Sequence, residues 1–223
     1  MTAVLINAGA IIAGSFTGLL IKKILNDRVR ATIMQGLGIA VVVIGLIDAV
    51  KTENILFLSV SLVAGGLLGS LLKIEEGVNK FGAFLESKLA RDENDKVGRA
   101  FVTASLIVCI GGMAVYGSLQ AGIGQPQTLY IKALLDGVIS LMLSAALGWG
   151  VALSAMPLLV IEGVICLSSG FLIPIVNDAF LNLLSGIGGA LVTCVGINLL
   201  EIKEIHTANL IPAVLGAFLA FLL

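Results

Sequence analysis

Residues 100–131 read AFVTASLIVCIGGMAVYGSLQAGIGQPQTLYI and contain no charged side chain. A bilayer core of ~30 Å is crossed by about 20 apolar residues in an α-helix. This stretch is therefore long enough to span a membrane and to turn back at residues 122–126, where glycine and proline cluster. Other uncharged runs fill most of the chain, at 2–21, 31–47, 54–72, 137–161, 163–177, 179–200 and 205–223.

The composition of the 223-residue chain agrees with this pattern. It is 58% hydrophobic and 12% charged, whereas soluble domains carry about 25% charged residues. So few charges cannot cover a water-facing surface, which excludes a soluble domain, and so little polarity excludes disorder. The net charge of −1 gives no electrostatic basis for binding nucleic acid. We therefore expect an all-α, polytopic transmembrane helix bundle whose surroundings are the lipid bilayer.

Eight helices fit the uncharged runs. The segment 132–174 is too long for one span and divides near Gly148, Trp149 and Gly150. Ser154 is predicted to cap the following helix, Pro157 lies in its first turn and Pro174 follows its end. The predicted helices are 3–21, 31–49, 55–72, 100–119, 132–151, 155–173, 181–200 and 208–223.

The distribution of Lys and Arg predicts the orientation. Of the 13 such residues, eleven fall in the segments 22–30, 73–99 and 201–207, which lie on one side of an eight-span topology together with 151–154. Because cytoplasmic loops carry the excess of basic residues, both termini are predicted outside the cytoplasm. Lys22 and Lys23 follow the first apolar run instead of preceding it, which argues against a signal peptide.

The long basic segment 73–99 has a helical pattern of its own. Val78, Phe81, Leu85 and Leu89 recur at helical spacing with charged residues between them. This spacing predicts a short amphipathic helix on the inner membrane surface. It can serve as an anchored connector or as a regulatory contact.

Two stretches resemble each other. Residues 26–46 (NDRVRATIMQGLGIAVVVIGL) and 177–197 (NDAFLNLLSGIGGALVTCVGI) share five identities. The two stretches belong to the second and the seventh predicted helices. Because this offset of five helices is odd, the two units would cross the membrane in opposite orientations, as in many secondary transporters. Chance similarity between two apolar, glycine-rich stretches is the alternative. The expected division is repeat unit one at 1–72, the amphipathic loop at 73–99, a central hairpin at 100–152 and repeat unit two at 153–223.

Gly111 and Gly112 interrupt the helix predicted at 100–119. Glycine in a helix interior costs about 1 kcal/mol relative to alanine. The pair favours either a broken helix beside a permeation path or a close helix contact, and the sequence does not separate the two. Spaced small residues such as Gly14 and Gly18 likewise suit an intramolecular contact or a homodimer seam.

Glu162 is the most conspicuous polar residue, because a charge inside a span is costly and is usually functional. No Lys or Arg is near it in the sequence, so it suits a protonatable or cation-linked site, or a protonated carboxyl bonded to a neighbouring helix. Asp136 follows Lys132 by four residues, so it is either half of an ordinary ion pair near the outer surface or a further candidate for the pathway. Further candidates for lining a pathway are Asn7, Ser118 and Asn198.

Sites of other kinds are not predicted. The three cysteines lie in apolar spans, the single histidine, His206, has no other metal ligands beside it, and no nucleophile–base pair or phosphate-binding loop is present. We therefore expect no metal, no cofactor and no enzymatic activity.

The run 100–126 and the following KALLDGVISLMLSAALGWGV resemble a bacterial inner-membrane family, the domain-of-unknown-function family 554, with YdfK-like and YqgA-like members. The pattern of Asn7, Gly9, Gly14 and Gly18 is similar too. The resemblance implies a polytopic inner-membrane protein but no substrate. The family pattern often has proline at Gly112 and glutamine at Glu162, so a mechanism that depends on Glu162 would not be family-wide.

These features favour a transporter of a small solute or ion, with its site between the inverted repeats. The alternatives are an ion channel on the same scaffold, or a non-transporting membrane scaffold or sensor that uses residues 75–90 as its contact.

Overall fold

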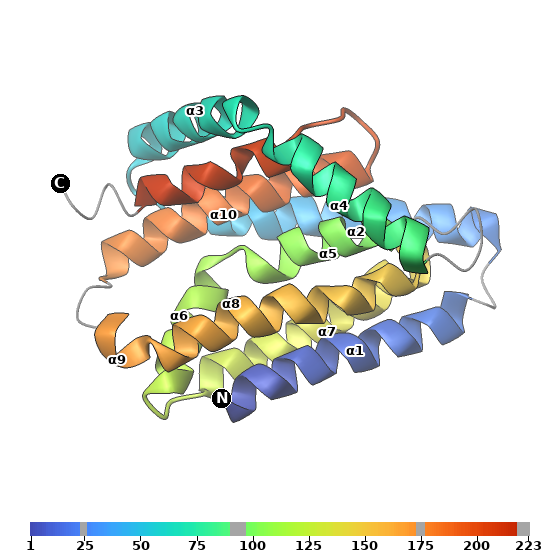
Figure 1. Ribbon diagram of the computed structural model, residues 1–223, viewed down its shortest axis with the longest axis horizontal. Coiled ribbons are helices and arrows are strands. Elements are labelled where there is room, and N and C mark those ends of the chain that lie inside the picture. Colours follow the sequence, from blue (N-terminus) through green and yellow to red (C-terminus); the bar gives the residue numbers. More distant parts are fainter. Residues whose placement is uncertain (23–25, 90–96, 173–176, 218–223) are drawn as a thin grey trace.

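A computed structural model describes residues 1–22, 26–89, 97–172 and 177–217, and every regular element within these ranges is helical. Long helices lie side by side as a bundle (Figure 1). The helices are α1 (Thr2–Lys22), α2 (Asp27–Ala49), α3 (Ile55–Leu71), α4 (Ile74–Leu89), α5 (Val97–Cys109), α6 (Gly112–Gly122), α7 (Gln127–Leu147), the 3-10 helix η1 (Trp149–Ser154), α8 (Ala155–Leu167), α9 (Ser169–Leu172), α10 (Asp178–Leu199) and the 3-10 helix η2 (Thr207–Ala213).

The all-α expectation is confirmed, and several helices are able to cross a membrane. Within the described ranges five are long and apolar enough, or up to seven if each of two bent pairs forms one span. Eight spans were predicted. The last of them, 208–223, is represented by η2 and its helical continuation to Ala217, and the rest lies outside the described residues.

The outward faces of the helices are those of a membrane protein. In α3 the buried residues are Ser61, Gly65 and Gly69, whereas Leu56 and Val63 are 76% and 75% exposed. A soluble helix would bury its large apolar side chains and expose its small polar ones. This inverted arrangement suits contact with lipid.

The glycine pair breaks its helix. Instead of one helix at 100–119, α5 and α6 meet at a bend of 63° around Ile110 and Gly111. The helix is therefore broken at the glycine pair. Gly111 also lies in close contact with α10, because a Cβ added to Gly188 would lie 3.2 Å from the Gly111 Cα.

The next boundary follows the glycines as predicted, with one correction. Helix α7 ends at Leu147, and Gly148 adopts φ 103°, a conformation that favours glycine. Ser154 does not cap α8. Its backbone is helical, and its hydroxyl donates to the Val151 carbonyl at 2.7 Å, because η1 already occupies the turn before α8. Pro174 lies outside the described residues.

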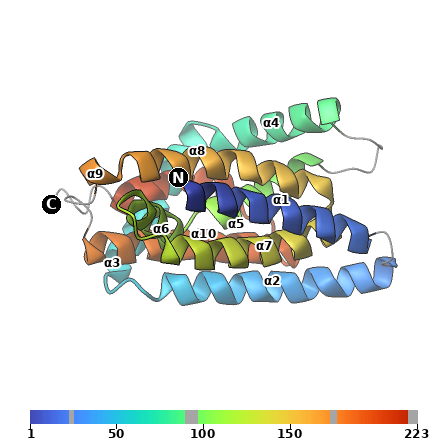
Figure 2. The same cartoon turned by 90° about the horizontal axis from the view of Figure 1, so that it is seen from below.

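The amphipathic helix predicted in the segment 73–99 is present as α4. It follows Lys73 and bends by 61° from α3. Its Phe81 ring packs edge-on against Phe101 of α5, with ring centroids 5.8 Å apart. Figure 2 shows α4 and α2 on opposite sides of the bundle.

Glycines set the pairing of the long helices. A Cβ at Gly14 would lie 2.1 Å from the Gly137 carbonyl oxygen, and one at Gly18 would lie 2.2 Å from the Leu141 carbonyl oxygen, so α1 and α7 run parallel in close contact. Other close contacts run in opposite directions along their helices. They join α2 to α10 (Gly38 to Leu200, Gly45 to Thr193) and α3 to η2 (Gly65 to Ala213, Gly69 to Asn209).

Two sets of connections lie at opposite ends of the bundle. The end of α1, the start of α2, η1 and residues 200–206 lie at one end (Figure 1). The start of α1, the α2–α3 connection and the α6–α7 turn lie at the other. Of the segments that the topology prediction places on one side, the described parts of 22–30, residues 151–154 and residues 201–206 are thus also grouped in space.

Candidate functional site

Glu162 is fully buried and faces α1. The Asn7 Nδ2 atom donates to both carboxylate oxygens of Glu162, at 3.0 and 3.1 Å. Because α8 runs back along α1, a residue near the start of α1 meets one near the end of α8. Two of the residues singled out in the sequence are therefore in direct contact.

Lys132 completes the cluster, although it was interpreted as a surface residue. Its side chain is only 8% exposed, and its Nζ lies 3.2 Å from Glu162 Oε1 and forms an ion pair with Asp136. The predicted ion pair with Asp136 is present but is buried instead of exposed, because α7 begins at Gln127 and not at 132. Lys132 thus lies about 8 Å into its helix, at 1.5 Å per residue.

The broken helix contributes the fifth member of the cluster. Lys132 Nζ donates to the Val108 carbonyl at 2.8 Å. Val108 is in the last turn of α5, where carbonyls have no acceptor role left within the helix. The break at Gly111 and the charge at Glu162, which are separate signals in the sequence, therefore belong to one site.

We call Asn7, Lys132, Asp136, Glu162 and the Val108 carbonyl the charged cluster. With both carboxylates ionised it carries two negative charges and one positive charge. Burial of uncompensated charge is unfavourable, so the cluster is suited to take up one more positive charge. The Asn7 Oδ1 atom is buried without a hydrogen-bond partner among the described residues, and a cation or a protonated group would satisfy it.

The other pathway candidates lie apart from the charged cluster or contribute indirectly. Asn198 folds the chain after α10, because its side chain donates to the Ile205 carbonyl and accepts from the Ile205 amide, both at 2.8 Å. Ser118 is fully buried in α6, and its hydroxyl has no partner in the described part of the chain. Gly111 and Gly112 act through the backbone break that frees the end of α5.

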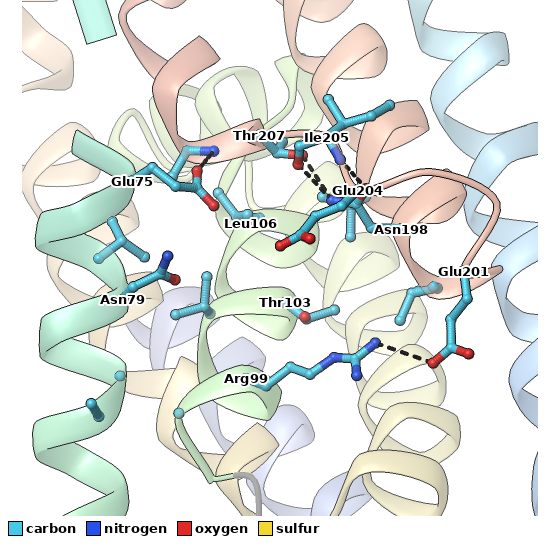
Figure 3. A pocket seen from close by; sticks show the side chains of 18 of the residues that line it. Glu75, Asn79, Arg99, Thr103, Leu106, Asn198, Glu201, Glu204, Ile205 and Thr207 are labelled. Carbon is cyan, nitrogen blue, oxygen red and sulfur yellow. Dashed lines mark hydrogen bonds and ion pairs between the residues drawn. The ribbon is translucent and has the colours of Figure 1, made fainter. Parts of the chain in front are cut away.

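Two cavities, which the sequence did not indicate, lie toward opposite ends of α10. The larger, of about 890 Å³, is bounded by α4, α5 and the chain after α10. Figure 3 shows Glu75 and Asn79 of α4 facing Arg99 and Thr103 of α5 across it. The smaller, of about 530 Å³, lies where the α2–α3 connection meets the start of α10. No pattern along the sequence points to either cavity.

The larger cavity is held by a reciprocal pair of caps and a weak ion pair. The Glu75 carboxylate accepts from the Ala208 amide at 2.9 Å, and Asn209 Oδ1 accepts from the Glu75 amide at 2.9 Å. The guanidinium of Arg99 lies 3.8 Å from the Glu201 carboxylate. The described residues contain no group of three His, Cys, Asp or Glu side chains that could hold a metal ion.

Comparisons with known proteins show which family the chain belongs to. An uncharacterized membrane protein, YdfK of Bacillus subtilis, is 33% identical over 223 residues, covering 96% of this chain and 93% of that protein. The uncharacterized protein YqgA of Escherichia coli is 26% identical over 217 residues, covering 95% of this chain and 92% of the relative. No solved structure matches. The model of a protein family of unknown function, DUF554, matches residues 2–222, and the chain therefore belongs to the DUF554 family of membrane proteins.

Proposed function

We propose that the chain transports a small solute or ion and that the charged cluster is the binding or coupling site. The observation that carries the proposal is the origin of the cluster's side chains. Asn7 comes from the proposed repeat unit one, Lys132 and Asp136 from the central hairpin and Glu162 from repeat unit two. Transporters built from inverted repeats place their sites where the units meet. The proposal assigns no enzymatic reaction.

The inverted repeat itself is part of the proposal, and local structure supports it. The matched residues Asn26 and Asn177 do the same work, since each side chain accepts from the amide three residues later, Val29 at 2.9 Å and Phe180 at 2.8 Å. Matched helices also pack against each other in opposite directions, α2 with α10 and α3 with η2. A two-fold axis in the membrane plane would produce both features.

The two cavities suit a carrier better than a channel. Between them, α10 is in close contact with its neighbours, because a Cβ at Gly189 would lie 2.4 Å from the Ala49 amide and one at Gly188 would lie 3.2 Å from Gly111. Two openings with a closed segment between them are expected of a carrier, and the charged cluster lies outside the lining of both cavities. Electrical recording separates the classes, since unitary currents far above carrier turnover would favour a channel.

The proposed location is the bacterial inner membrane, with both termini outside the cytoplasm. The larger cavity, with α4 beside it, would then open to the cytoplasm. The excess of Lys and Arg in the segments at that end supports this orientation.

A stability screen followed by flux measurement tests the proposal. The purified chain is heated in detergent with amino acids, organic acids, sugars and monovalent cations, and a ligand at 100 times its Kd should add about 2.7 kcal/mol of stability. The stabilising compound is then followed into proteoliposomes. We expect pH-dependent flux that Glu162→Gln and Glu162→Ala abolish and that Glu76→Gln, at an exposed surface pair, leaves unchanged. Unchanged flux and pH dependence in the Glu162 variants would remove the cluster from the mechanism.

A further inference from the structure

One face of α7 is polar along nearly its whole length. Thr128, Lys132, Asp136, Ser140 and Ser144 follow one another at intervals of four residues. Residues with this spacing are neighbours one turn apart, and because each is about 40° further round than the last, the row winds gradually around the helix. From Thr128 to Ser144 the row rises by sixteen residue steps, or ~24 Å, most of the thickness of a bilayer core. We call these five residues the polar stripe.

The polar stripe faces protein and not lipid. Its last four members are buried, with Ser140 and Ser144 fully so, whereas Leu134 and Val138 on the opposite side of α7 are 71% and 51% exposed. Apolar side chains would fill such a buried face at no desolvation cost. Five polar residues there need a partner or a function.

One member of the polar stripe has no hydrogen-bond partner in the part of the chain that the structure describes. The hydroxyl of Ser140, one turn beyond Asp136, forms no hydrogen bond with any described residue, not even with a carbonyl of its own helix. The same is true of Ser15 on α1, which follows the contact of Gly14 with Gly137. Fully buried hydroxyls of this kind point to a small polar species that enters between the helices.

Both ends of the polar stripe continue into polar groups. At the α6 end, Thr128 donates to Gln120 Oε1 at 2.8 Å, and Gln120 donates to the hydroxyl of Tyr116. At the other end, Ser144 donates to the Gly148 carbonyl at 3.2 Å, and the Lys22 ammonium lies beside Gly148. The charged cluster is therefore connected in both directions.

We propose that the polar stripe is a proton route, along which protons pass between the charged cluster and the Gly148 end of α7. This rests on the proposed function, for which it names the coupling ion. In each hop an O–H bond of the donor breaks, one forms on the acceptor, and the acceptor's own hydrogen moves on, so hydroxyl and charge are restored. Side chains one turn apart are 5–6 Å apart, a gap that one water molecule bridges.

The composition of the polar stripe favours a proton over an alkali cation. Hydroxyl groups both donate and accept, which a relay requires, whereas Na⁺ needs several oxygen ligands around one point. The ammonium of Lys132 would repel a metal cation at the cluster. Among the described residues, other titratable groups near the stripe include Glu162 on α8, Cys109 at the end of α5, Lys22 on α1 and Tyr116 on α6.

Proton flux into liposomes tests the route. The full chain is reconstituted with pyranine in the lumen, and valinomycin with a K⁺ gradient sets a membrane potential that draws protons inward. We expect acidification by the wild type and a rate at least about tenfold lower in Ser140→Ala. Ser140→Thr, which keeps the hydroxyl, should retain the rate. The matched control is Ser61→Ala, because Ser61 is also a buried serine but lies on α3.

Three results would overturn the route: no proton flux through the wild type, a wild-type rate in Ser140→Ala, or flux that follows an imposed Na⁺ gradient and ignores pH. Unfolding in detergent shows whether Ser140→Ala is folded, and Ser144→Ala gives a second removal of a stripe hydroxyl. If only the proton route is wrong, solute flux that depends on Glu162 is still observed. If the proposed function is wrong, that solute flux is absent as well.

Discussion

The charged cluster and the larger cavity accommodate charged side chains in opposite ways within one bundle. In the cluster, Lys132 and Glu162 are buried with their ionic groups in contact and the backbones of α1 and α7 touching nearby. At the cavity, Arg99 and Glu201 are well exposed and only loosely paired. The buried ion pairs therefore lie where the helices are closely packed, and the ion pair at the cavity lies where water can solvate it. Helix α5, which ends at the break, reaches both regions, because its Val108 contacts Lys132 and its Leu106 lines the cavity.

This contrast predicts which substitutions lower the free energy of unfolding most. An ion pair in the cluster depends on its partners for solvation, so removal of one member leaves the others without compensation. An ion pair at the cavity exchanges its partner for water at little cost. Equal losses in unfolding free energy on removal of a charge at the two places would contradict this contrast.

The largest effect is expected for Lys132→Met. It leaves two buried carboxylates without a cation, and loss of one partner of a buried pair costs about 3–5 kcal/mol. Equilibrium unfolding in mixed detergent micelles measures it. Lys51→Met, at the exposed pair with Asp48, should change the unfolding free energy by less than about 1 kcal/mol. Equal losses in the two variants would show that the cluster is not dry.

The next effect concerns the close contact beside the cluster. Gly14→Ala puts a methyl group against the Gly137 backbone and should cost about 1–3 kcal/mol in the same assay. Gly9→Ala on the same helix meets nothing within 4 Å and should stabilise the chain by up to ~1 kcal/mol, because alanine favours helix. If Gly14→Ala also stabilised the chain, α1 and α7 would be further apart than the contact implies.

The sequence predicted most of the fold because its signals are local. Charge-free runs and glycine pairs mark helices and their ends without reference to any other segment. The errors have equally local causes. Polar residues at 127 and 128 hid the first turn of α7, and η1 occupied the turn that Ser154 was expected to cap.

The site was only half predictable. Glu162, Asp136 and Asn7 are conspicuous on their own, but a contact between residues 155 positions apart depends on which helices pack together and at what level. Lys132 was missed as a ligand of Glu162 for this reason. The cavities have no signal along the chain, since they are defined by what the helices leave unfilled.

The repeat gives a smaller, paired effect. Asn26→Ala and Asn177→Ala each remove the side-chain acceptor at the start of a helix, which costs about 1 kcal/mol. If the two positions are equivalent, the two losses in unfolding free energy should agree within error. A loss at one position only would contradict the match between α2 and α10.

The smallest effect is expected at the mouth of the larger cavity. The atoms that join Arg99 and Glu201 are 3.8 Å apart, and both side chains are largely exposed, so Arg99→Gln should cost less than about 1 kcal/mol. Any loss should shrink further when the ionic strength is raised, since a Debye length of about 8 Å at 0.15 M screens solvated pairs. The cost of Lys132→Met should resist the same increase in salt, because ions do not enter a packed interior. Equal sensitivity to salt at both sites would mean that water reaches the charged cluster.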